Sequence, residues 1–204
     1  MKEYILKVTD QLTHWSGQFG NAYTNRNAED PSHRLPIFRE ILSGLSLDRV
    51  LEVGCNRGYN LITFSQLLGD VELFGIEPNR YAIEIARQSG DRIKVLPGNV
   101  FCLPFEDEYF DMVLTAGVLI HIALPDLSEA IREIYRVSRR YVLAIEYYAD
   151  IETEIPYRGR NDLLWKRDFL RYYKEEFPDL RLIRTGYWEW NESNWWLLEK
   201  EPRG

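Results

Sequence analysis

The feature that most constrains this chain is a short apolar run that leads straight into two closely spaced glycines and then into a helical pattern. Residues 49–53, RVLEV, read as a buried strand, and Gly54 and Gly58 follow at once. Beyond them, the apolar residues at positions 61, 64, 67 and 68 have the spacing of one helix face. Because glycine permits sharp turns and close approach by a ligand, this order favours an α/β fold with a binding site at the turn.

The alternation of short strands and amphipathic helices continues along the chain. We expect further strands near residues 71–76, 93–96, 110–114 and 141–145, and an antiparallel hairpin from residues 180–185 and 195–199. Strands joined by helical crossovers pair in parallel, with right-handed connections. The sequence therefore predicts a Rossmann-like, doubly wound, mainly parallel seven-stranded α/β sheet with a C-terminal antiparallel hairpin.

The predicted elements divide the chain unequally. Residues 1–34 are polar and aromatic and read as an irregular N-terminal lead-in or lid, whereas residues 35–204 form the sheet-containing domain. One helix is expected at the start of that domain, and another around residues 161–177, before the hairpin. A length of 204 residues fits one domain with a small appendage.

Composition narrows the classes of partner. A net charge of −7 disfavours long nucleic acid, because such binders need a positive surface to displace counterions from phosphates. No apolar run approaches the ~18 residues that span a bilayer, and the polar N-terminus does not fit a signal peptide. Two cysteines and three histidines show no metal-ligand spacing. We expect a cytoplasmic protein, monomeric or homodimeric, with a small-molecule partner, no membrane partner and no metal.

Polar residues close the predicted strands. Glu77 ends the second strand, 25 positions after Glu52, and a carboxylate there can accept both hydroxyls of an adenosine ribose. Asn99 follows the third strand, and its amide can reach an adenine edge. The alternatives are a solvated helix N-cap at Glu77 and a plain turn at Gly54, but the signals together favour a nucleoside site.

These residues carry a family resemblance. ExGxxxG at residues 52–58, the acid at 77, LPF at 103–105 with FDMV at 110–113, and the terminal hairpin resemble the class I S-adenosylmethionine-dependent methyltransferases over residues 35–200. The chain departs from many members at Asn56, which replaces a glycine, and at Asn99, which replaces an aspartate. The resemblance implies S-adenosylmethionine as cofactor and S-adenosylhomocysteine as product. The implied cofactor contacts are Glu52, Gly54, Cys55, Asn56, Gly58, Glu77, Pro78, Asn99, Val100, Thr115 and Ala116.

Further motifs are similar to those of the pseudaminic acid biosynthesis-associated methylases. They are WSGQFG at residues 15–20, YTNRN at 23–27, EVGCNRGYN at 52–60, GIEPN at 75–79, GVLIHI at 117–122, EYY at 146–148, YRG at 157–159 and LWKRDF at 164–169. The family name records an association with a pathway for a nine-carbon acidic sugar. It implies a role in sugar biosynthesis, with O- or N-methylation of an acidic sugar or sugar nucleotide.

Two residues are candidates for catalysis. A sulfonium methyl is already activated, so the enzyme mainly aligns a nucleophile with the S–CH3 bond. His121 comes shortly after the fourth strand, at the crevice where doubly wound sheets bind ligands, and an ordinary histidine pKa suits a general base. Glu146 ends the fifth strand and is the second candidate. A histidine bonded to backbone is the alternative reading of His121.

An anionic acceptor is the hypothesis for the residues after the fifth strand. Arginine forks match carboxylates and phosphates, so Arg158, with Tyr148 and Tyr157, is predicted to bind the acceptor, the alternative being a solvated loop. A lid over the pocket is predicted from Tyr23, Asn25 and Arg26, the alternative being N-terminal packing. The tryptophans at 188, 190, 195 and 196 read as hairpin packing or a dimer surface rather than an acceptor platform.

Three other functions compete with that of a small-molecule methyltransferase. An NAD-dependent oxidoreductase shares the strand, glycine turn and acid, but its fingerprint is GxGxxG, whereas the glycines here fall as GxxxG. A regulatory or scaffold subunit that binds the cofactor without transferring the methyl group would contain the same glycine turn. It would differ from a methyltransferase only in the residues that bind the acceptor. Transfer to RNA or protein is disfavoured by the acidic charge and by the lack of an appended recognition domain.

Overall fold

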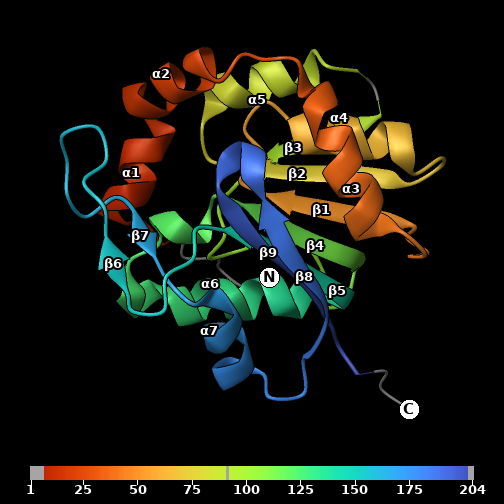
Figure 1. The fold of residues 1–204 in the computed structure, drawn as a ribbon. Helices are drawn as coiled ribbons and strands as arrows, with labels where there is room; N and C mark the ends of the chain where they lie inside the picture. Colours follow the sequence, from red (N-terminus) through yellow and green to blue (C-terminus); the bar gives the residue numbers. More distant parts are fainter. Residues whose placement is uncertain (1–6, 91, 202–204) are drawn as a thin grey trace.

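Seven strands form one sheet in the order β3–β2–β1–β4–β5–β9–β8 (Figure 1). The computed structural model describes residues 7–90 and 92–201. Neighbouring strands from β1 to β5 pair in parallel, and β9 and β8 add an antiparallel hairpin at the β5 side. The predicted fold class is therefore confirmed. The strands are β1 Arg49–Val53, β2 Glu72–Glu77, β3 Ile93–Pro97, β4 Phe110–Ala116, β5 Ser138–Glu146, β8 Arg181–Trp188 and β9 Ser193–Glu199.

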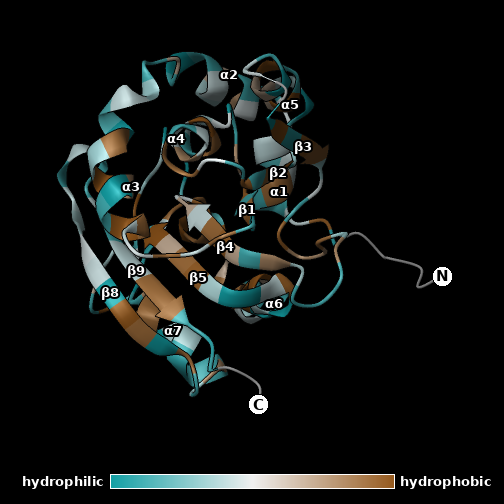
Figure 2. Ribbon diagram, turned by 90° about the vertical axis from the view of Figure 1, so that its right-hand side faces the viewer, coloured by the Kyte–Doolittle hydropathy of each residue, from teal (hydrophilic) through white to brown (hydrophobic). Residues whose placement is uncertain are grey.

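Helices cover both faces of the sheet. One face packs against α3 Leu35–Leu42, α4 Tyr59–Leu67 and α5 Arg80–Arg87, and the other packs against α6 Leu124–Val137 and α7 Phe169–Glu176. Figure 2 shows the apolar strands β5 and β9 inside this sandwich. Because the central strands are covered on both sides, they are nearly continuous apolar runs, as parallel strands are expected to be.

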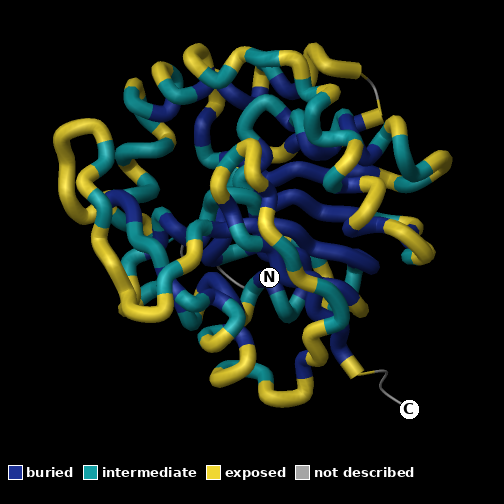
Figure 3. Tube along the Cα trace, viewed as in Figure 1, coloured by how far each residue is buried: buried dark blue, intermediate teal, exposed yellow. Residues whose placement is uncertain are grey.

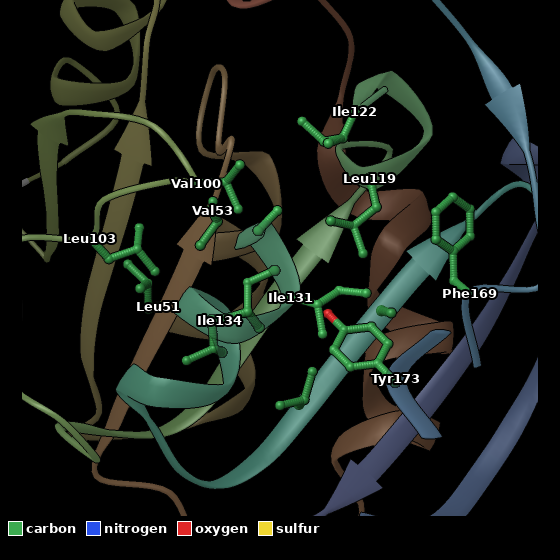
Figure 4. Close-up of a cluster of buried hydrophobic side chains, with 14 of the residues drawn as sticks. Leu51, Val53, Val100, Leu103, Leu119, Ile122, Ile131, Ile134, Phe169 and Tyr173 are labelled. Carbon is green, nitrogen blue, oxygen red and sulfur yellow. The ribbon is translucent and has the colours of Figure 1, made fainter. Parts of the chain in front are cut away.

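The side chains of β1 divide between two apolar layers. Leu51 belongs to the layer beneath α6 and α7, and Val50 belongs to the layer beneath α3, α4 and α5. Figure 4 shows Leu51 with Ile131, Ile134 and Tyr173 in the first layer, and Figure 3 shows the central strands as buried. This packing holds the carboxyl ends of β1, β2, β3 and β4 at one edge of the sheet, where the ligand crevice of a doubly wound fold lies.

The N-terminal segment is helical, which corrects the prediction of an irregular lead-in. Two short helices, α1 Asp10–Ser16 and α2 Gln18–Arg26, precede the 3-10 turn Pro31–Arg34. The Thr9 hydroxyl accepts from the Leu12 N–H at 3.0 Å and caps α1, a signal that the sequence carried. Both helices lie at the strand-end side of the molecule, at the upper left of Figure 1. The first six residues of the predicted lead-in lie outside the described residues.

The segment before the C-terminal hairpin also differs from its prediction. The helix expected around residues 161–177 begins only at Phe169, where the Asp168 carboxylate caps it by accepting from the Arg171 N–H at 3.0 Å. The preceding residues are extended, because β6 Thr153–Glu154 and β7 Trp165–Lys166 pair with each other. Short 3-10 turns at Leu119–His121 and Glu189–Asn191 complete the elements.

None of the helices within residues 7–90 and 92–201 combines the length and the apolar character that a bilayer-spanning helix needs.

Candidate functional site

A cavity of about 430 Å³ opens at the carboxyl ends of the parallel strands. Two groups of residues line it, and they differ in character. The strand-end wall consists of residues 52–57, 77–79, 99–101 and 116–118, which end β1, β2, β3 and β4. The aromatic wall consists of Trp15, Tyr23, Tyr147, Tyr157, Trp188 and Trp190, which come from the N-terminal helices, the segment after β5 and the hairpin.

The glycine turn after β1 leaves no room for a side chain. Gly54 has a φ of +73°, and a Cβ added there would lie 2.5 Å from the Cγ2 of Val118. The Gly54 N–H donates to the Ile76 carbonyl at 2.7 Å, which fastens the turn to β2. Gly58 has a φ of +72° and precedes α4. The turn is therefore a tight backbone cradle of the kind that lets a ligand approach the main chain.

Glu77 is a buried carboxylate that organises the loops on either side of it. One oxygen accepts from the Asn56 N–H at 2.8 Å and the other accepts from the Asn79 N–H at 2.9 Å. The side chain is only 6% exposed, and burial raises its pKa to about 7. The α5 cap is Asn79, whose Oδ1 accepts from the Ala82 N–H, so Glu77 is not the solvated N-cap of the alternative reading.

Glu52 is the second buried carboxylate of the strand-end wall. Its Oε1 accepts from the Asn60 side-chain amide at 2.6 Å, and burial raises its pKa to about 8. In the described part of the chain, Glu52 Oε2 and Asn60 Oδ1 have no hydrogen-bond partner. Buried acceptors are normally satisfied, so these two atoms call for a ligand that carries N–H or O–H donors.

Two arginines that were not among the predicted site residues also line the cavity, and the charge of one of them, Arg34, acts on Glu52. Arg57 donates from Nε to the Tyr59 hydroxyl at 3.1 Å, and its Nη1 has no partner among the described residues. Arg34 donates from Nη2 to Glu29 at 2.7 Å, and both arginines line the cavity. Arg57 sits inside the glycine turn, so its position was a usable signal. Arg34 reaches the site only through tertiary packing.

Two asparagines tie the strand-end wall to the N-terminal helices. The main-chain N–H of each one donates to the buried carboxylate that ends β2. The Asn56 side-chain amide donates to the Thr24 hydroxyl at 3.0 Å. The Asn79 side-chain amide lies within hydrogen-bonding distance of the Trp15 and Gly17 carbonyls, at 3.1 and 3.2 Å. The helices that cover the cavity are thus bonded to the same residues that shape its floor.

Asn99 lies at the end of β3 and is 8% exposed. Its Oδ1 accepts from the Phe101 N–H at 2.9 Å, which leaves its NH2 group without a hydrogen bond from the residues described. Val100, next to it, is buried and also lines the cavity. This corner offers an apolar surface and one amide donor, which suits the edge and face of a heterocyclic base.

His121 lines the cavity between two aromatic rings. Its ring centroid lies 4.4 Å from that of Trp15 and 5.8 Å from that of Tyr157. Its Nδ1 lies 2.5 Å from the Leu163 carbonyl, and because a carbonyl only accepts, Nδ1 carries the proton. Burial lowers the pKa of His121 to about 4. The ring is therefore neutral at physiological pH, with Nε2 as an acceptor, and it is a weaker base than an ordinary histidine.

Glu146 supports the cavity from behind. Its carboxylate accepts from the main-chain N–H groups of Val118, Leu119 and Ile120 at 3.2 to 3.3 Å, and it is fully buried. Burial raises its pKa to about 7. Glu146 is not among the described residues that line the cavity. Its contacts are those of a residue that positions the turn after β4.

The structure brings most of the predicted cofactor contacts together. Gly58 and Thr115 are outside the described lining, because Gly58 precedes α4 and the Thr115 side chain is fully buried in β4. The predicted contacts that do line the cavity are Glu52, Gly54, Cys55, Asn56, Glu77, Pro78, Asn99, Val100 and Ala116.

The predicted acceptor residues are less well gathered. Tyr23 and Tyr157 line the cavity. Exposed residues that do not appear in its described lining are Asn25, Arg26, Tyr148 and Arg158. The Tyr148 hydroxyl donates to Asp150, and the Asn25 side chain accepts from the Tyr81 hydroxyl at 2.7 Å. Arg158 occupies a left-handed turn, with a φ of +53°.

The C-terminal hairpin reaches the cavity, which the sequence reading of its tryptophans missed. Trp195 and Trp196 are buried in the two apolar layers, as hairpin packing requires. Trp188 and Trp190, at the turn, line the cavity instead, together with Asn191 and Ser193. The sequence did not show where the hairpin turn lies. Because β8 runs to Trp188, the turn lies on the side of the sheet where the parallel strands end.

Comparison with known proteins agrees with this geometry. The order and direction of the strands, with helices on both faces, are those of a Rossmann-like methyltransferase fold. Residues 50–140 match the family described as Methyltransferase domain. The chain is 30% identical over 150 residues to an uncharacterized methyltransferase of Schizosaccharomyces pombe, a match that covers 65% of the chain and 50% of that relative. The chain thus spans about half the length, or less, of the curated relatives it matches here.

Two solved structures show the same fold at low sequence identity. Burkholderia thailandensis 1,6-didemethyltoxoflavin-N1-methyltransferase, with bound 1,6-didemethyltoxoflavin and S-adenosylhomocysteine, has a TM-score of 0.70 at 12% identity, covering 94% of this chain and 87% of that one. The magnesium protoporphyrin IX methyltransferase of Synechocystis, with bound S-adenosylmethionine, also has a TM-score of 0.70 at 12% identity, with coverages of 95% and 99%.

Proposed function

We propose that this chain binds S-adenosylmethionine along the strand-end wall and transfers its methyl group to a small anionic acceptor beside the aromatic wall. One observation carries the proposal: two buried carboxylates, Glu52 and Glu77, flank a turn in which Gly54 leaves no space for a Cβ. Carboxylates in these positions accept from ammonium and hydroxyl groups, and the cofactor offers both. The fold and the bound cofactors of the two solved structures support this assignment.

The unpartnered atoms suggest how the cofactor lies. The ribose hydroxyls would donate to Glu77, and the adenine edge would accept from the NH2 group of Asn99. At the other end, the ammonium would donate to Glu52 Oε2 and Asn60 Oδ1, and the carboxylate would accept from Arg57 Nη1. Each hydrogen-bond donor of the cofactor would thereby meet an acceptor of the protein, and each acceptor would meet a donor.

S-Adenosylmethionine supplies a methyl group that is already activated on a sulfonium, so the chain mainly has to align the nucleophile and keep water out. Trp15 and Tyr23, which lie over the cavity with ring centroids 5.1 Å apart, would exclude water. His121 Nε2 would accept the hydrogen bond of the nucleophile and orient it. Glu146 acts as a positioning residue, through the turn that carries His121.

We infer that residues 1–34 serve as a lid and residues 35–204 as the methyltransferase domain. The hydrogen bonds of Asn56 and Asn79 to the N-terminal helices support this division. We further propose that the acceptor is an acidic sugar or sugar nucleotide, methylated on oxygen or nitrogen. The motifs shared with the pseudaminic acid biosynthesis-associated methylases support that class, and the arginines of the cavity suit its charge.

A second function competes with transfer. A cofactor-binding protein without activity would have an intact strand-end wall and an incomplete acceptor side. The positions of Tyr148 and Arg158, outside the described lining of the cavity, favour that reading, because two predicted acceptor contacts do not converge there.

Calorimetric titration with S-adenosylmethionine, S-adenosylhomocysteine and NAD tests the cofactor. We expect micromolar binding of both sulfur compounds and none of NAD. Failure of both sulfur compounds to bind would overturn the proposal. Binding without a methyl-mass gain on acidic sugars or sugar nucleotides would favour the second function.

A further inference from the structure

Three tyrosines of the aromatic wall line the cavity, and their hydroxyls have no hydrogen-bond partner in the described part of the chain. Tyr23 comes from α2, Tyr147 follows β5, and Tyr157 lies in a turn between β6 and β7. Tyrosine hydroxyls that line a cavity and are not bonded within the protein are available to donate hydrogen bonds to a ligand.

Two of the three phenols, Tyr23 and Tyr147, remain protonated at neutral pH. Burial, followed by the neighbouring Tyr157 and Tyr147, raises the pKa of Tyr23 to about 12. Burial and then Tyr157 also raise the pKa of Tyr147. Phenols in this state donate hydrogen bonds at neutral pH and do not act as bases.

Two of the three tyrosine rings pack against neighbouring aromatic side chains. Tyr23 packs edge-on against Trp15 at 5.1 Å, and Tyr157 packs edge-on against Phe19 at 5.9 Å. The Tyr157 turn is closed by its own N–H, which donates to the Arg160 carbonyl at 2.7 Å. Donors on rings that are already ordered lose little entropy when a ligand binds.

Charges of both signs act on the phenols, with Arg26 and Arg34 acting on Tyr23, and Glu192 and Glu146 acting on Tyr147. Arg34 lines the same cavity, and its charge acts on Tyr23. Glu29 is paired with Arg34, and the Glu146 carboxylate accepts from main-chain N–H groups. The wall therefore presents hydroxyl donors beside a cation, a combination that suits oxygen acceptors and a negative charge.

We propose that Tyr23, Tyr147 and Tyr157 form the acceptor subsite and donate hydrogen bonds to the carboxylate and hydroxyl oxygens of a small, hydroxyl-rich carboxylic acid. The inference rests on the proposed function, because this acid would receive the methyl group. It moves acceptor recognition from Arg158, on an exposed turn, to hydroxyls inside the cavity.

The test uses N-acetylneuraminate as the acid probe and N-acetylmannosamine as its uncharged counterpart. Each is titrated by calorimetry into the full chain, with and without saturating S-adenosylhomocysteine. The variants Tyr147→Phe and Tyr157→Phe remove only the hydroxyl. Tyr187→Phe, at a tyrosine of β8 that is 53% exposed, is the matched control.

We expect the acid to bind the wild type more tightly than the neutral sugar, and each cavity variant to bind the acid about 5-fold to 20-fold more weakly. The control and the affinity for S-adenosylhomocysteine should stay unchanged. Equal binding of both sugars, no binding of the acid, or full acid affinity in both cavity variants would overturn the subsite. A different result would count against the proposed cofactor and not against the subsite. In that result the wild type does not bind S-adenosylhomocysteine, but it binds the acid, and the acid affinity still falls in the two cavity variants.

Discussion

The two walls of the cavity are built by different means. The strand-end wall follows from one rule, since parallel strands place their carboxyl ends at one edge and the loops there carry the polar groups. The aromatic wall joins segments that are far apart in sequence, such as Trp15, Tyr157 and Trp190. The first wall is mostly backbone turns and buried carboxylates, and the second is side chains that rely on tertiary packing.

The two walls should therefore differ in how well they tolerate substitutions. Changes in the strand-end wall disturb turns that the sheet itself needs. Changes in the aromatic wall alter contacts without touching the sheet, so under the proposed function they would change acceptor binding while the cofactor site stays intact. The following experiments either sharpen this division or break it.

The largest effect is expected from Gly54→Ala. The new Cβ would lie 2.5 Å from the Cγ2 of Val118, and the alanine would have to adopt a φ of +73°. Backbone strain and overpacking together should lower the free energy of unfolding by about 2 to 5 kcal/mol and remove measurable binding of S-adenosylhomocysteine. Denaturant unfolding and calorimetry measure the two quantities.

Gly44→Ala is the matched control for that change. Gly44 has a φ of +72° with nothing within 4 Å of an added Cβ, so it reports the backbone strain alone. We expect a loss of only about 1 to 2 kcal/mol there, with unchanged cofactor affinity. Equal losses at the two glycines would show that the cradle at Gly54 is not sterically filled.

Glu77→Gln should weaken S-adenosylhomocysteine binding by about 10-fold to 100-fold. The substitution keeps the shape but leaves one acceptor oxygen for the N–H groups of Asn56 and Asn79 and for the ribose. Glu72→Gln, at the exposed start of β2, should leave the affinity unchanged. Wild-type affinity in Glu77→Gln would contradict the assignment of the ribose site.

The buried acids should make the unliganded protein less stable as pH rises. The pKa of Glu77 is about 7 in the folded chain and 4.5 ordinarily, so the unfolded chain binds fewer protons between those values. Glu52 and Glu146 act in the same direction. His121, whose pKa is lowered to about 4 from 6.5, opposes them only below its ordinary value.

We therefore expect the free energy of unfolding to fall by on the order of 1 to 2 kcal/mol between pH 6.5 and 8, measured by urea titration at each pH. Glu77→Gln should flatten this slope, because the glutamine does not titrate. A stability that rises with pH over this window would mean that these carboxyls are ionised in the folded chain.

The smallest effect is expected at Arg158. This residue is exposed, has a φ of +53° and lies outside the described lining of the cavity. Arg158→Gly should change the unfolding free energy by less than about 0.5 kcal/mol and should leave probe affinity within error. A large loss of acid binding would return acceptor recognition to this turn and would break the division between the walls.

The strand-end wall could be predicted from the sequence because its signals are local. Glu52, Gly54 and Glu77 can be read from strand ends without knowing how distant segments pack. The two N-terminal helices were missed because each is short and lacks a continuous apolar stripe, so tertiary contacts rather than periodicity stabilise them.

The aromatic wall could be predicted only in part. Tyr23 and Tyr157 were selected through motifs, whereas Tyr147 and Trp190 are defined by where β5 and the hairpin turn end in space. Glu146 was placed at the correct strand end, but its bonding to three N–H groups depends on a turn that spacing cannot reveal. Side-chain direction at loop residues is set by partners far away in the sequence.

The two asparagines that bond both the cofactor loop and the N-terminal helices should affect how fast a ligand leaves the cavity. Asn56 and Asn79 each bond the loop of the cofactor site through their main chain and the N-terminal helices through their side chains. A ligand that orders one side must therefore steady the other, and the helices cannot swing away without loosening the loop. We expect the residence time of the spent cofactor to follow the opening rate of α1 and α2, so that turnover would be governed by release rather than by the methyl transfer itself.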